Sequence, residues 1–261
     1  MIKTAKKTNL KITVKVDNNH PFVFLSGEAD SSNIKELVSI LNELAAKYPG
    51  SVTLDFSGVD SLEVCALEPF AQGANVYREK NRQVHIKDAS SKVKEVFEKT
   101  LLSDLFCDDI NNSANCDHHS NSTPWELDVF CLPYSINCSK EARHRIANIV
   151  KTVGFDDADC QDIVLAVGEA VANAVKHGKP ADGNGKITVS CFATPDKVAI
   201  SVSDDGPGIP VDKLNKKIDP ERPILDESGR GLFCIKSVMD EVSISVDSGT
   251  TLRMIKYKTA H

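Results

Sequence analysis

The stretch GEAVANAVKHG, residues 168–178, decides how the second half of this chain folds. Its small apolar residues continue a pattern that starts at Ile163 and recurs at steps of three and four, which predicts one buried helix face. Glu169, Asn173 and His177 follow one another every four residues along a separate line of the same helix. A solvated polar face would give the same pattern, so this helix alone does not distinguish a surface from a site.

Two glycine-rich segments follow this helix. Residues 204–208 (DDGPG) come directly after a predicted strand, and their glycines and proline predict a sharp turn that lets the backbone approach a ligand. An aspartate at a strand end can accept a hydrogen bond from an exocyclic amine. Residues 228–232 (SGRGL) open another helix, whose free N–H groups suit phosphate. Each segment alone also fits an ordinary turn or helix start, and only the ordered set is specific.

Together the three motifs resemble the ATPase fold shared by histidine kinases, gyrases, Hsp90-type chaperones and MutL proteins. Within that superfamily they resemble the anti-sigma-factor serine kinases, over nearly all of residues 127–258. The resemblance implies a Bergerat-type ATP-binding fold, an α/β sandwich, for residues 127–261. No helix pair with a phosphoacceptor histidine is evident, which disfavours a sensor histidine kinase. The domain is also too small for a gyrase or a chaperone.

The resemblance implies a role for each matching residue. Glu169 would orient or deprotonate the attacking hydroxyl, Asn173 would hold the Mg²⁺ that bridges the triphosphate of ATP, and Asp204 would bind the adenine amino group. Gly206 and Gly208 would let the chain pass close to the base and ribose. The other residues implied at the nucleotide are His177, Ile209, Ser228, Gly229, Arg230, Gly231 and Leu232, with Gly229 and Gly231 cradling phosphates.

The segment between the last two motifs departs from the family at one position. Residues 212–228 would form a lid over the nucleotide. Glu227 stands where the stress-type kinases often place an arginine near the γ-phosphate. Arg222 or Arg230 would have to supply that charge instead.

The first half alternates predicted strands and helices. Hydrophobic alternation and turn residues predict strands at 11–16, 22–25, 52–56 and 84–86, and helices at 34–44, from Pro69, and at 91–102. Residues 54–59 (LDFSGV) and the helix near Ala66 resemble a STAS domain, the fold of anti-sigma-factor antagonists, over about residues 8–106. An unrelated small α/β domain is the alternative.

The hydroxyl turn typical of STAS antagonists is missing from the first half. Those proteins carry D-S-S-G-L or D-S-T-G-L, and the segment that matches by counting from Leu54 is EVCAL, residues 63–67. Cys65 therefore occupies the position of the phosphorylated hydroxyl. If the register differs, Ser61 after Asp60 is the alternative acceptor.

The second half has the layout of one layered domain. A strand is expected at 127–132, a helix from Ser139, a hairpin at 187–191 and 198–202, and a closing hairpin at 242–246 and 251–257. This order predicts helices on one face of a mostly antiparallel sheet. The chain is thus expected to be a two-domain α/β protein.

Composition excludes several classes of function. The 261 residues are 41% hydrophobic and 26% charged, with a net charge of -6 and no long Lys/Arg run, which argues against nucleic acid binding. No apolar stretch is long enough for a membrane span, so a cytoplasmic protein is expected. The eight cysteines show no CxxC spacing and are expected to be reduced. Residues 107–126 are expected to be a linker; they hold Cys107, Cys116, His118 and His119, which have zinc-ligand chemistry but no finger spacing.

Two classes of function remain open. The first is an ATP-dependent serine/threonine kinase that acts in a partner-switching pathway, binding a sigma factor or a STAS-domain antagonist, with a homodimer left open. The second is a non-catalytic module that binds ATP or sequesters a partner. A plain ATP hydrolase is less favoured, because nothing in the sequence suggests a mechanical partner.

Overall fold

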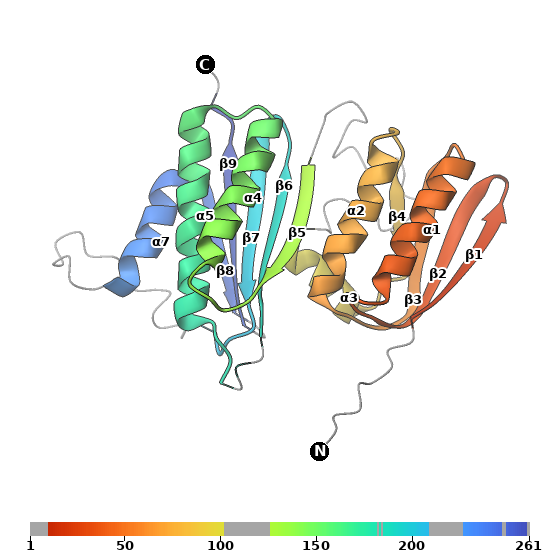
Figure 1. Ribbon diagram of the computed structural model, residues 1–261, viewed down its shortest axis with the longest axis horizontal. Helices are drawn as coiled ribbons and strands as arrows, with labels where there is room; N and C mark the ends of the chain where they lie inside the picture. Colours follow the sequence, from red (N-terminus) through yellow and green to blue (C-terminus); the bar gives the residue numbers. More distant parts are fainter. Residues whose placement is uncertain are drawn as a thin grey trace. The chain divides into compact units, whose positions relative to one another are not determined.

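The computed structural model describes residues 10–101, 126–181, 183, 185–208, 227–246 and 249–259. The chain divides into two compact units, Met1–Thr123 and Pro124–His261 (Figure 1). Each unit is described by itself. The expected linker, apart from its last residue, lies outside the described residues, and so does its group of Cys107, Cys116, His118 and His119.

The first unit is a four-stranded sheet in the order β1-β2-β3-β4. β1 pairs antiparallel with β2, and β2, β3 and β4 pair in parallel. Helices α1 and α2 cross one face of this sheet (Figure 1). The strands are β1 (Lys11–Asp17), β2 (His20–Ala29), β3 (Val52–Leu62) and β4 (Val84–Lys87). The helices are α1 (Ile34–Lys47), the short 3₁₀ helix η1 (Val64–Ala66), α2 (Leu67–Arg78) and α3 (Ser91–Lys99).

Three aromatic rings hold the helices of the first unit to its sheet. Phe56 of β3 meets Phe70 of α2 edge-on at 6.2 Å between centroids and Phe97 of α3 at 5.5 Å. Phe70 and Phe97 stack at 6.2 Å. All three are almost fully buried, and edge-on pairs at these separations are favourable beyond their area. Through Phe97, the third helix therefore packs against β3.

Strand β3 runs beyond its expected end at Phe56 to Leu62. Its Ser-Gly step is typical of a turn, yet Gly58 lies opposite Ser26 in the pairing with β2. A Cβ on Gly58 would stand 2.7 Å from that of Ser26 and 2.9 Å from the carbonyl oxygen of Leu25. Because glycine leaves room for this close approach, the pairing continues where the sequence indicates a turn.

The extended β3 sets the start of the next helix. Glu63 follows the strand, and its N–H donates to the carbonyl of Ala29 at 2.9 Å. Cys65 then lies in η1, immediately before α2, and is half-buried. Ser61 instead lies within β3, paired with Glu28, and is exposed.

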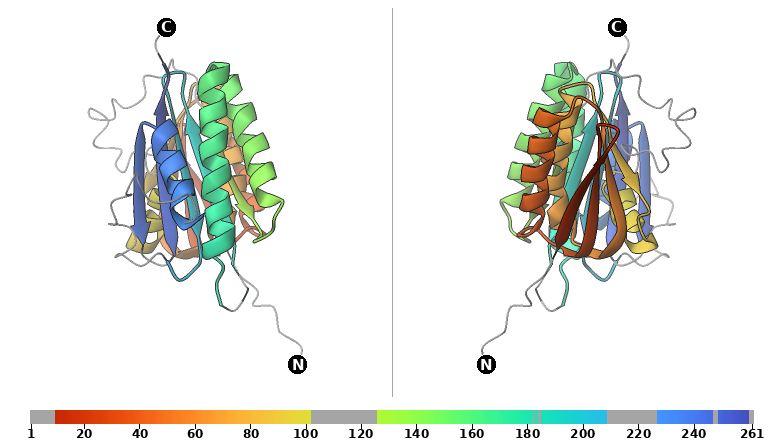
Figure 2. Two further views of the ribbon diagram at one scale, coloured as in Figure 1. Left: turned by 90° about the vertical axis from the view of Figure 1, so that its left-hand side faces the viewer. Right: turned by 90° about the vertical axis from the view of Figure 1, so that its right-hand side faces the viewer.

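The second unit is a five-stranded antiparallel sheet in the order β5-β6-β7-β9-β8. Helices α4, α5 and α7 lie side by side on one face of it (Figure 2), which confirms the predicted sandwich. The strands are β5 (Glu126–Leu132), β6 (Ile187–Ala193), β7 (Lys197–Asp204), β8 (Glu241–Val246) and β9 (Thr250–Tyr257). The helices are α4 (Cys138–Thr152), α5 (Asp157–His177) and α7 (Glu227–Val238).

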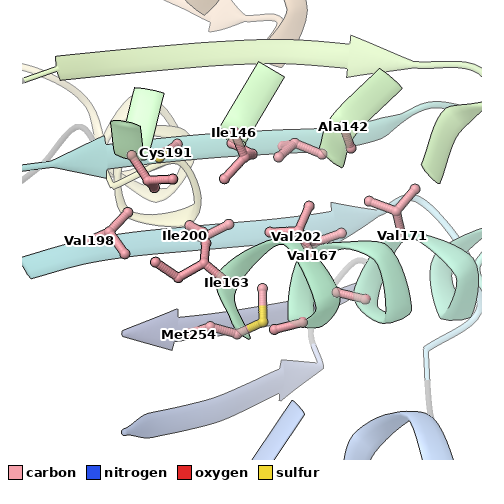
Figure 3. Packing of buried hydrophobic residues seen from close by; sticks show 14 of the residues in the cluster. Ala142, Ile146, Ile163, Val167, Val171, Cys191, Val198, Ile200, Val202 and Met254 are labelled. Atoms are coloured by element: carbon pink, nitrogen blue, oxygen red, sulfur yellow. The ribbon is translucent and has the colours of Figure 1, made fainter. Parts of the chain in front are cut away.

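The core of the second unit lies between these helices and the sheet. Ile146 of α4, Ile163 of α5 and Ile200 of β7 are each 0% exposed, and Met254 of β9 completes the layer from the neighbouring strand (Figure 3). The alternation predicted for β6 and β7 is the one observed, with one side chain in two facing the helices. Burial of this continuous apolar layer fixes the position of α5 on the sheet.

The cysteines and the helix lengths bear on two further expectations. Cys65, Cys131, Cys138, Cys160, Cys191 and Cys234 are free thiols, as expected for these six. Among the helices of the described ranges, none combines the length and apolarity needed to cross a bilayer.

Two histidines of the first unit make its stability depend on pH. His20 Nε2 lies 2.8 Å from Thr53 Oγ1, and His85 pairs with Thr53 in the sheet. Burial lowers the pKa of both imidazoles below 6.5, and proximity to His20 lowers that of His85 further. The folded state favours the neutral rings, so their contribution to stability is complete above the unfolded pKa and is lost as the pH falls through the lower folded values.

We expect His85→Gln to reduce the loss of thermal stability on acidification from about pH 7.5 to about pH 5.5, because glutamine takes up no proton. Calorimetric unfolding of the full chain at several pH values measures this. If variant and parent lose equal stability over that range, the assignment to His85 is wrong.

Candidate functional site

Helix α5 carries the polar line expected from the sequence. Asp156 caps the helix, since its carboxylate accepts a hydrogen bond from the N–H of Asp159 at 2.8 Å. One face of the helix is buried in the core, as described above. Glu169 and Asn173 are half-buried beside that face, and His177 in the last turn is exposed. The polar line therefore lies at the margin of the core, where its side chains can reach a ligand.

Helix α7 brings its backbone against this line. A Cβ on Gly231 would lie 3.0 Å from Asn173 Nδ2, 3.2 Å from Asn173 Oδ1 and 3.2 Å from Glu169 Oε2. Gly231 is itself buried. A side chain at this position would press on both polar groups, which would have to shift by a few tenths of an ångström to admit a Cβ. The first and third motifs of the sequence therefore meet in one place.

The first turn of α7 holds the rest of the third motif. The helix begins at Glu227, so residues 228–230 are helical and Gly229 contributes one of the N–H groups that have no partner within a helix. Gly231 follows these three residues, and its role is the close approach to Asn173 and Glu169. Leu232 is half-buried and packs against the core of the unit. The side chains of residues 227–230 lie outside the described part, as do Ile209 and the expected lid up to residue 226.

The turn after β7 is packed tightly around Asp204. A Cβ on Gly206 would collide with the carbonyl of Gly178, and a Cβ on Gly178 would collide with the carboxylate of Asp204. Gly249 has a φ of +127° and backs onto the Asp204 carbonyl oxygen, and Gly208 has a φ of +77°. Such positive φ values favour glycine. Backbone from the end of α5, from β7 and from the start of β9 thus meets at the second motif.

The carboxylate of Asp204 has one occupied oxygen. Oδ1 accepts hydrogen bonds from the N–H of Gly206 at 3.0 Å and of Thr250 at 3.3 Å. Within the described ranges, no hydrogen bond reaches Oδ2. Burial raises the pKa of this carboxyl and Asp205 adds to the effect, while the two N–H donors and His177 oppose it. Oδ2 therefore keeps its capacity to accept a hydrogen bond.

Tyr134, on the loop between β5 and α4, supports this turn and was missed by sequence reasoning. Its hydroxyl accepts from the N–H of Asp205 at 3.1 Å and donates to the carbonyl of Lys186 at 3.3 Å. The N–H of Lys186 in turn donates to Asp205 Oδ2 at 2.9 Å. Burial raises the pKa of Tyr134 to about 12, so the hydroxyl keeps its proton at neutral pH. No spacing in the sequence links these residues.

Arg143 of α4 is a second residue that the sequence did not indicate. Its guanidinium lies against Gly168, the neighbour of Glu169 in the chain. Its Nε is buried and has no hydrogen-bond partner among the described residues. A single arginine within an amphipathic helix carries no signal that sets it apart from a surface residue.

The described residues of the site could bind a magnesium ion through one or two protein oxygens, with water completing its coordination. In the described ranges, no group of three or more His, Cys, Asp or Glu side chains could hold a metal. Mg²⁺ keeps several water ligands and binds proteins through one or two oxygens together with substrate phosphates. The amide of Asn173, beside Glu169 and the start of α7, offers that kind of partial site.

The two units match known families separately. Residues 136–256 match the family model of the histidine kinase-like ATPase domain, and residues 12–106 match that of the Mlab, STAS domain. Serine-protein kinase RsbW of Bacillus licheniformis is 33% identical over 120 residues, and RsbW of Bacillus subtilis is 30% identical over 120 residues. Each match covers 44% of this chain and 75% of the relative.

A crystal structure of the RsbU and RsbW domains of a Mycobacterium tuberculosis protein is 25% identical, with a TM-score of 0.39. The match covers 52% of this chain and 33% of that one.

We expect Gly231→Ala to stabilise the chain while weakening its binding of Mg²⁺-ATP, the ligand that the resemblance implies. Alanine favours a helix over glycine by roughly 0.5–1 kcal/mol. Its Cβ would press on Asn173 and Glu169, and we expect a loss of affinity of about tenfold, ~1.4 kcal/mol. Calorimetric titration and thermal unfolding measure the two effects.

Ser237→Ala provides the matched control for Gly231→Ala. Ser237 is an exposed residue of the same helix, and its hydroxyl donates to the Cys234 carbonyl within α7. This change should also favour the helix but leave the affinity alone. Equal affinity in Gly231→Ala and parent would show that the close contact does not matter for binding.

Proposed function

Because this chain belongs, through its second unit, to the family of the serine-protein kinase RsbW, we propose that it is an ATP-dependent serine/threonine protein kinase of the anti-sigma-factor type. Its substrates would be STAS-domain antagonist proteins, which it binds and phosphorylates in a partner-switching pathway. The observation that carries the proposal is the contact of Gly231 with both Asn173 and Glu169. That contact brings a candidate metal ligand, a candidate base and the start of a helix to one point.

Phosphoryl transfer depends on how the protein positions the reactants and neutralises charge, more than on covalent chemistry by the protein. Asp204 Oδ2 would accept a hydrogen bond from the adenine amino group and so fix the base. The unpaired N–H groups in the first turn of α7 would face the phosphates. Bound Mg²⁺ neutralises charge on the phosphate oxygens. Asn173 would contribute one oxygen to hold it.

Glu169 would act on the substrate hydroxyl. Its carboxylate takes up the hydroxyl proton as the oxygen bonds to the γ-phosphorus and the bond to ADP breaks. Glu169 is half-buried and lies one helical turn from Asn173, so base and metal ligand share a face. In this proposal the acceptor hydroxyl approaches on that shared face.

Further features of the proposal follow from the family. A sigma factor is the second partner we propose, bound in exchange with the antagonist, and a homodimer is the proposed assembly. The cytoplasm, where such regulators act, is the proposed location. The rival function is a non-catalytic module that binds ATP or sequesters a partner. Glu227, the first residue of α7, favours that rival, since an acidic side chain there would oppose the γ-phosphate.

Asn173→Ala and Glu169→Gln separate binding from transfer. We expect Asn173→Ala to remove the metal-dependent part of ATP affinity, because it deletes the metal ligand. Glu169→Gln should keep the affinity and lose at least about 100-fold in transfer, because it keeps the volume and removes the base. Titration with and without Mg²⁺ and transfer of radiolabelled phosphate to STAS-domain proteins are the measurements.

The same assay decides between the two functions. A parent chain that binds Mg²⁺-ATP but labels no STAS-domain protein would favour the non-catalytic module. A Glu169→Gln chain that transfers phosphate at the parental rate would remove Glu169 from the base role, and an Asn173→Ala chain with parental Mg²⁺-ATP affinity would remove Asn173 from the metal site.

We also expect the first unit not to be phosphorylated by the attached kinase. Cys65 occupies the turn before α2, and neither it nor Val64 carries a hydroxyl group. Ser61 is held within β3 by its pairing with Glu28, away from that turn, and misplacement of an acceptor by even about 1 Å can cost 100-fold in rate.

Mass spectrometry of the full chain after incubation with Mg²⁺-ATP tests this expectation. The Glu169→Gln chain is the control for background phosphate. Stoichiometric phosphate on Ser61 that disappears in Ser61→Ala would show instead that the first unit is an ordinary antagonist fused to its own kinase.

A further inference from the structure

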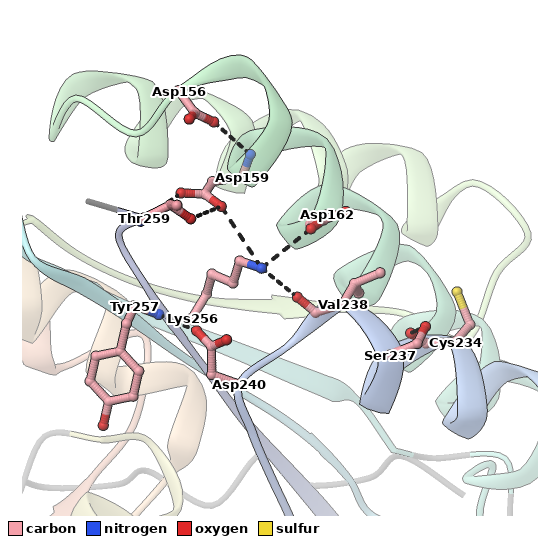
Figure 4. Close-up of polar contacts among 10 residues, drawn as sticks. All are labelled: Asp156, Asp159, Asp162, Cys234, Ser237, Val238, Asp240, Lys256, Tyr257 and Thr259. Atoms are coloured by element: carbon pink, nitrogen blue, oxygen red, sulfur yellow. Dashed lines mark hydrogen bonds and ion pairs between the residues drawn. The ribbon is translucent and has the colours of Figure 1, made fainter. Parts of the chain in front are cut away.

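A lysine that is largely shielded from solvent holds the C-terminal end of α7. Lys256 lies on β9 with a side chain only 13% exposed. Its Nζ donates to the carbonyl oxygen of Val238, the last residue of α7, at 2.8 Å (Figure 4). The last carbonyls of a helix lack partners within the helix and carry its negative dipole end, so an ammonium group is favourable there.

The same ammonium group reaches α5. Lys256 Nζ lies 3.3 Å from Asp162 Oδ2 and 3.8 Å from Asp159 Oδ1 (Figure 4). The side chain of Asp159 is only 6% exposed and accepts two further hydrogen bonds, from the N–H and the hydroxyl of Thr259 at 3.2 and 3.1 Å. Because a buried charge is costly without its partners, this arrangement specifies where α5, α7 and β9 meet.

The backbone beyond α7 is tied to the same strand. The N–H of Asp240 donates to the Ile255 carbonyl at 2.9 Å, and the Asp240 carboxylate accepts from the N–H of Tyr257 at 2.6 Å. Both bonds flank Lys256 along β9. The C-terminal end of α7 is therefore held both by the hydrogen bonds of Asp240 to β9 and by the bond of Lys256 to Val238.

Toward its other end, α7 approaches Asn173 and Glu169 closely at Gly231. Gly231 lies seven residues before Val238, about 10 Å along the helix axis. At Gly231 the space to Asn173 and Glu169 has no room for a methyl group without displacement. A small tilt of α7 about its C-terminal end would open or close this contact by several tenths of an ångström. The direction of α7 at Val238 therefore contributes to the geometry at Gly231, together with the core packing of Ile235 between them.

We propose that Lys256 is a positioning residue of the candidate nucleotide site. It acts through α7: by holding Val238 to Asp159 and Asp162 of α5, it sets the distance of the glycine end of the helix from Asn173 and Glu169. The effect of Lys256 on nucleotide binding rests on the proposed function, whereas its effect on the position of α7 is independent of that function.

Lys256→Met in the full chain tests the proposal, since methionine keeps much of the stem and removes the ammonium. We expect faster amide hydrogen exchange in residues 231–238 without nucleotide, and a loss of Mg²⁺-ATP affinity of about tenfold, as for a displaced contact. Arg145→Met is the matched control. It removes a 2.7 Å ion pair with Asp128 and a stacking contact with Phe130, on α4 and β5, and should leave exchange in α7 unchanged.

A merely structural role would give a different result. If Lys256→Met and Arg145→Met speed exchange in α7 and weaken the nucleotide equally, or if Lys256→Met leaves either quantity at the parental value, the proposal is overturned. Should Lys256→Met fail to fold, Asp162→Asn decides in its place. It weakens one contact at a residue that is 40% exposed, and we expect smaller changes of the same sign. Parental values for Asp162→Asn would then overturn the proposal.

The proposed function and the positioning role fail in different ways. A parent chain that does not bind Mg²⁺-ATP removes the proposed function. Exchange in α7, measured without nucleotide, then still decides whether Lys256 positions the helix.

Discussion

Two helices of the second unit meet where one of them has no side chain, and the candidate site depends on that contact. Gly231 of α7 leaves just enough space for the amide of Asn173 and the carboxylate of Glu169 on α5. The apolar face of α5 is fixed by the core, so the backbone positions from which these two polar groups project are fixed as well. A packing constraint of the fold thus becomes a geometric constraint on chemistry.

Strand β9 connects the parts of the site that bind different groups. At its start the N–H of Thr250 bonds to Asp204 Oδ1, and near its end Lys256 holds the last carbonyl of α7. Strand β9 therefore helps to position both the carboxylate proposed to bind the base and the helix proposed to face the phosphates. Because β9 lies between β7 and β8 in the sheet, hydrogen bonding on both sides keeps it rigid.

The first unit presents a STAS-like frame with an altered turn. The continued pairing of β3 past Gly58 carries the chain to η1, and the position before α2 is filled by Cys65. A thiol at this place does not match a kinase site built for an alcohol. Under the proposed function, the unit would be a docking or regulatory domain and not an antagonist substrate. The hydroxyl groups phosphorylated by the second unit would then belong to separate proteins.

Local patterns in the sequence were sufficient for the elements and for the order of the motifs. The period of α5, the alternation of β6 and β7 and the glycine turns after β7 depend on residues close together in the chain, so they were predicted and are observed. The identity of the family followed from the same motifs. The roles of Ile209 and of the lid stay predictions, since these residues lie outside the described part.

Contacts between distant segments were decided only by the tertiary structure. Sequence reasoning ended β3 at Phe56, because a Ser-Gly step indicates a turn unless a neighbouring strand approaches closely enough to need the glycine. The hydroxyl of Tyr134 and the ammonium of Lys256 act on residues 71 and 18 positions away, at Asp205 and Val238. Periodicity and turn chemistry report on each element alone. Which elements touch is set by sheet register and core packing, and so the sequence by itself determined the pieces of the site while the fold determined their distances.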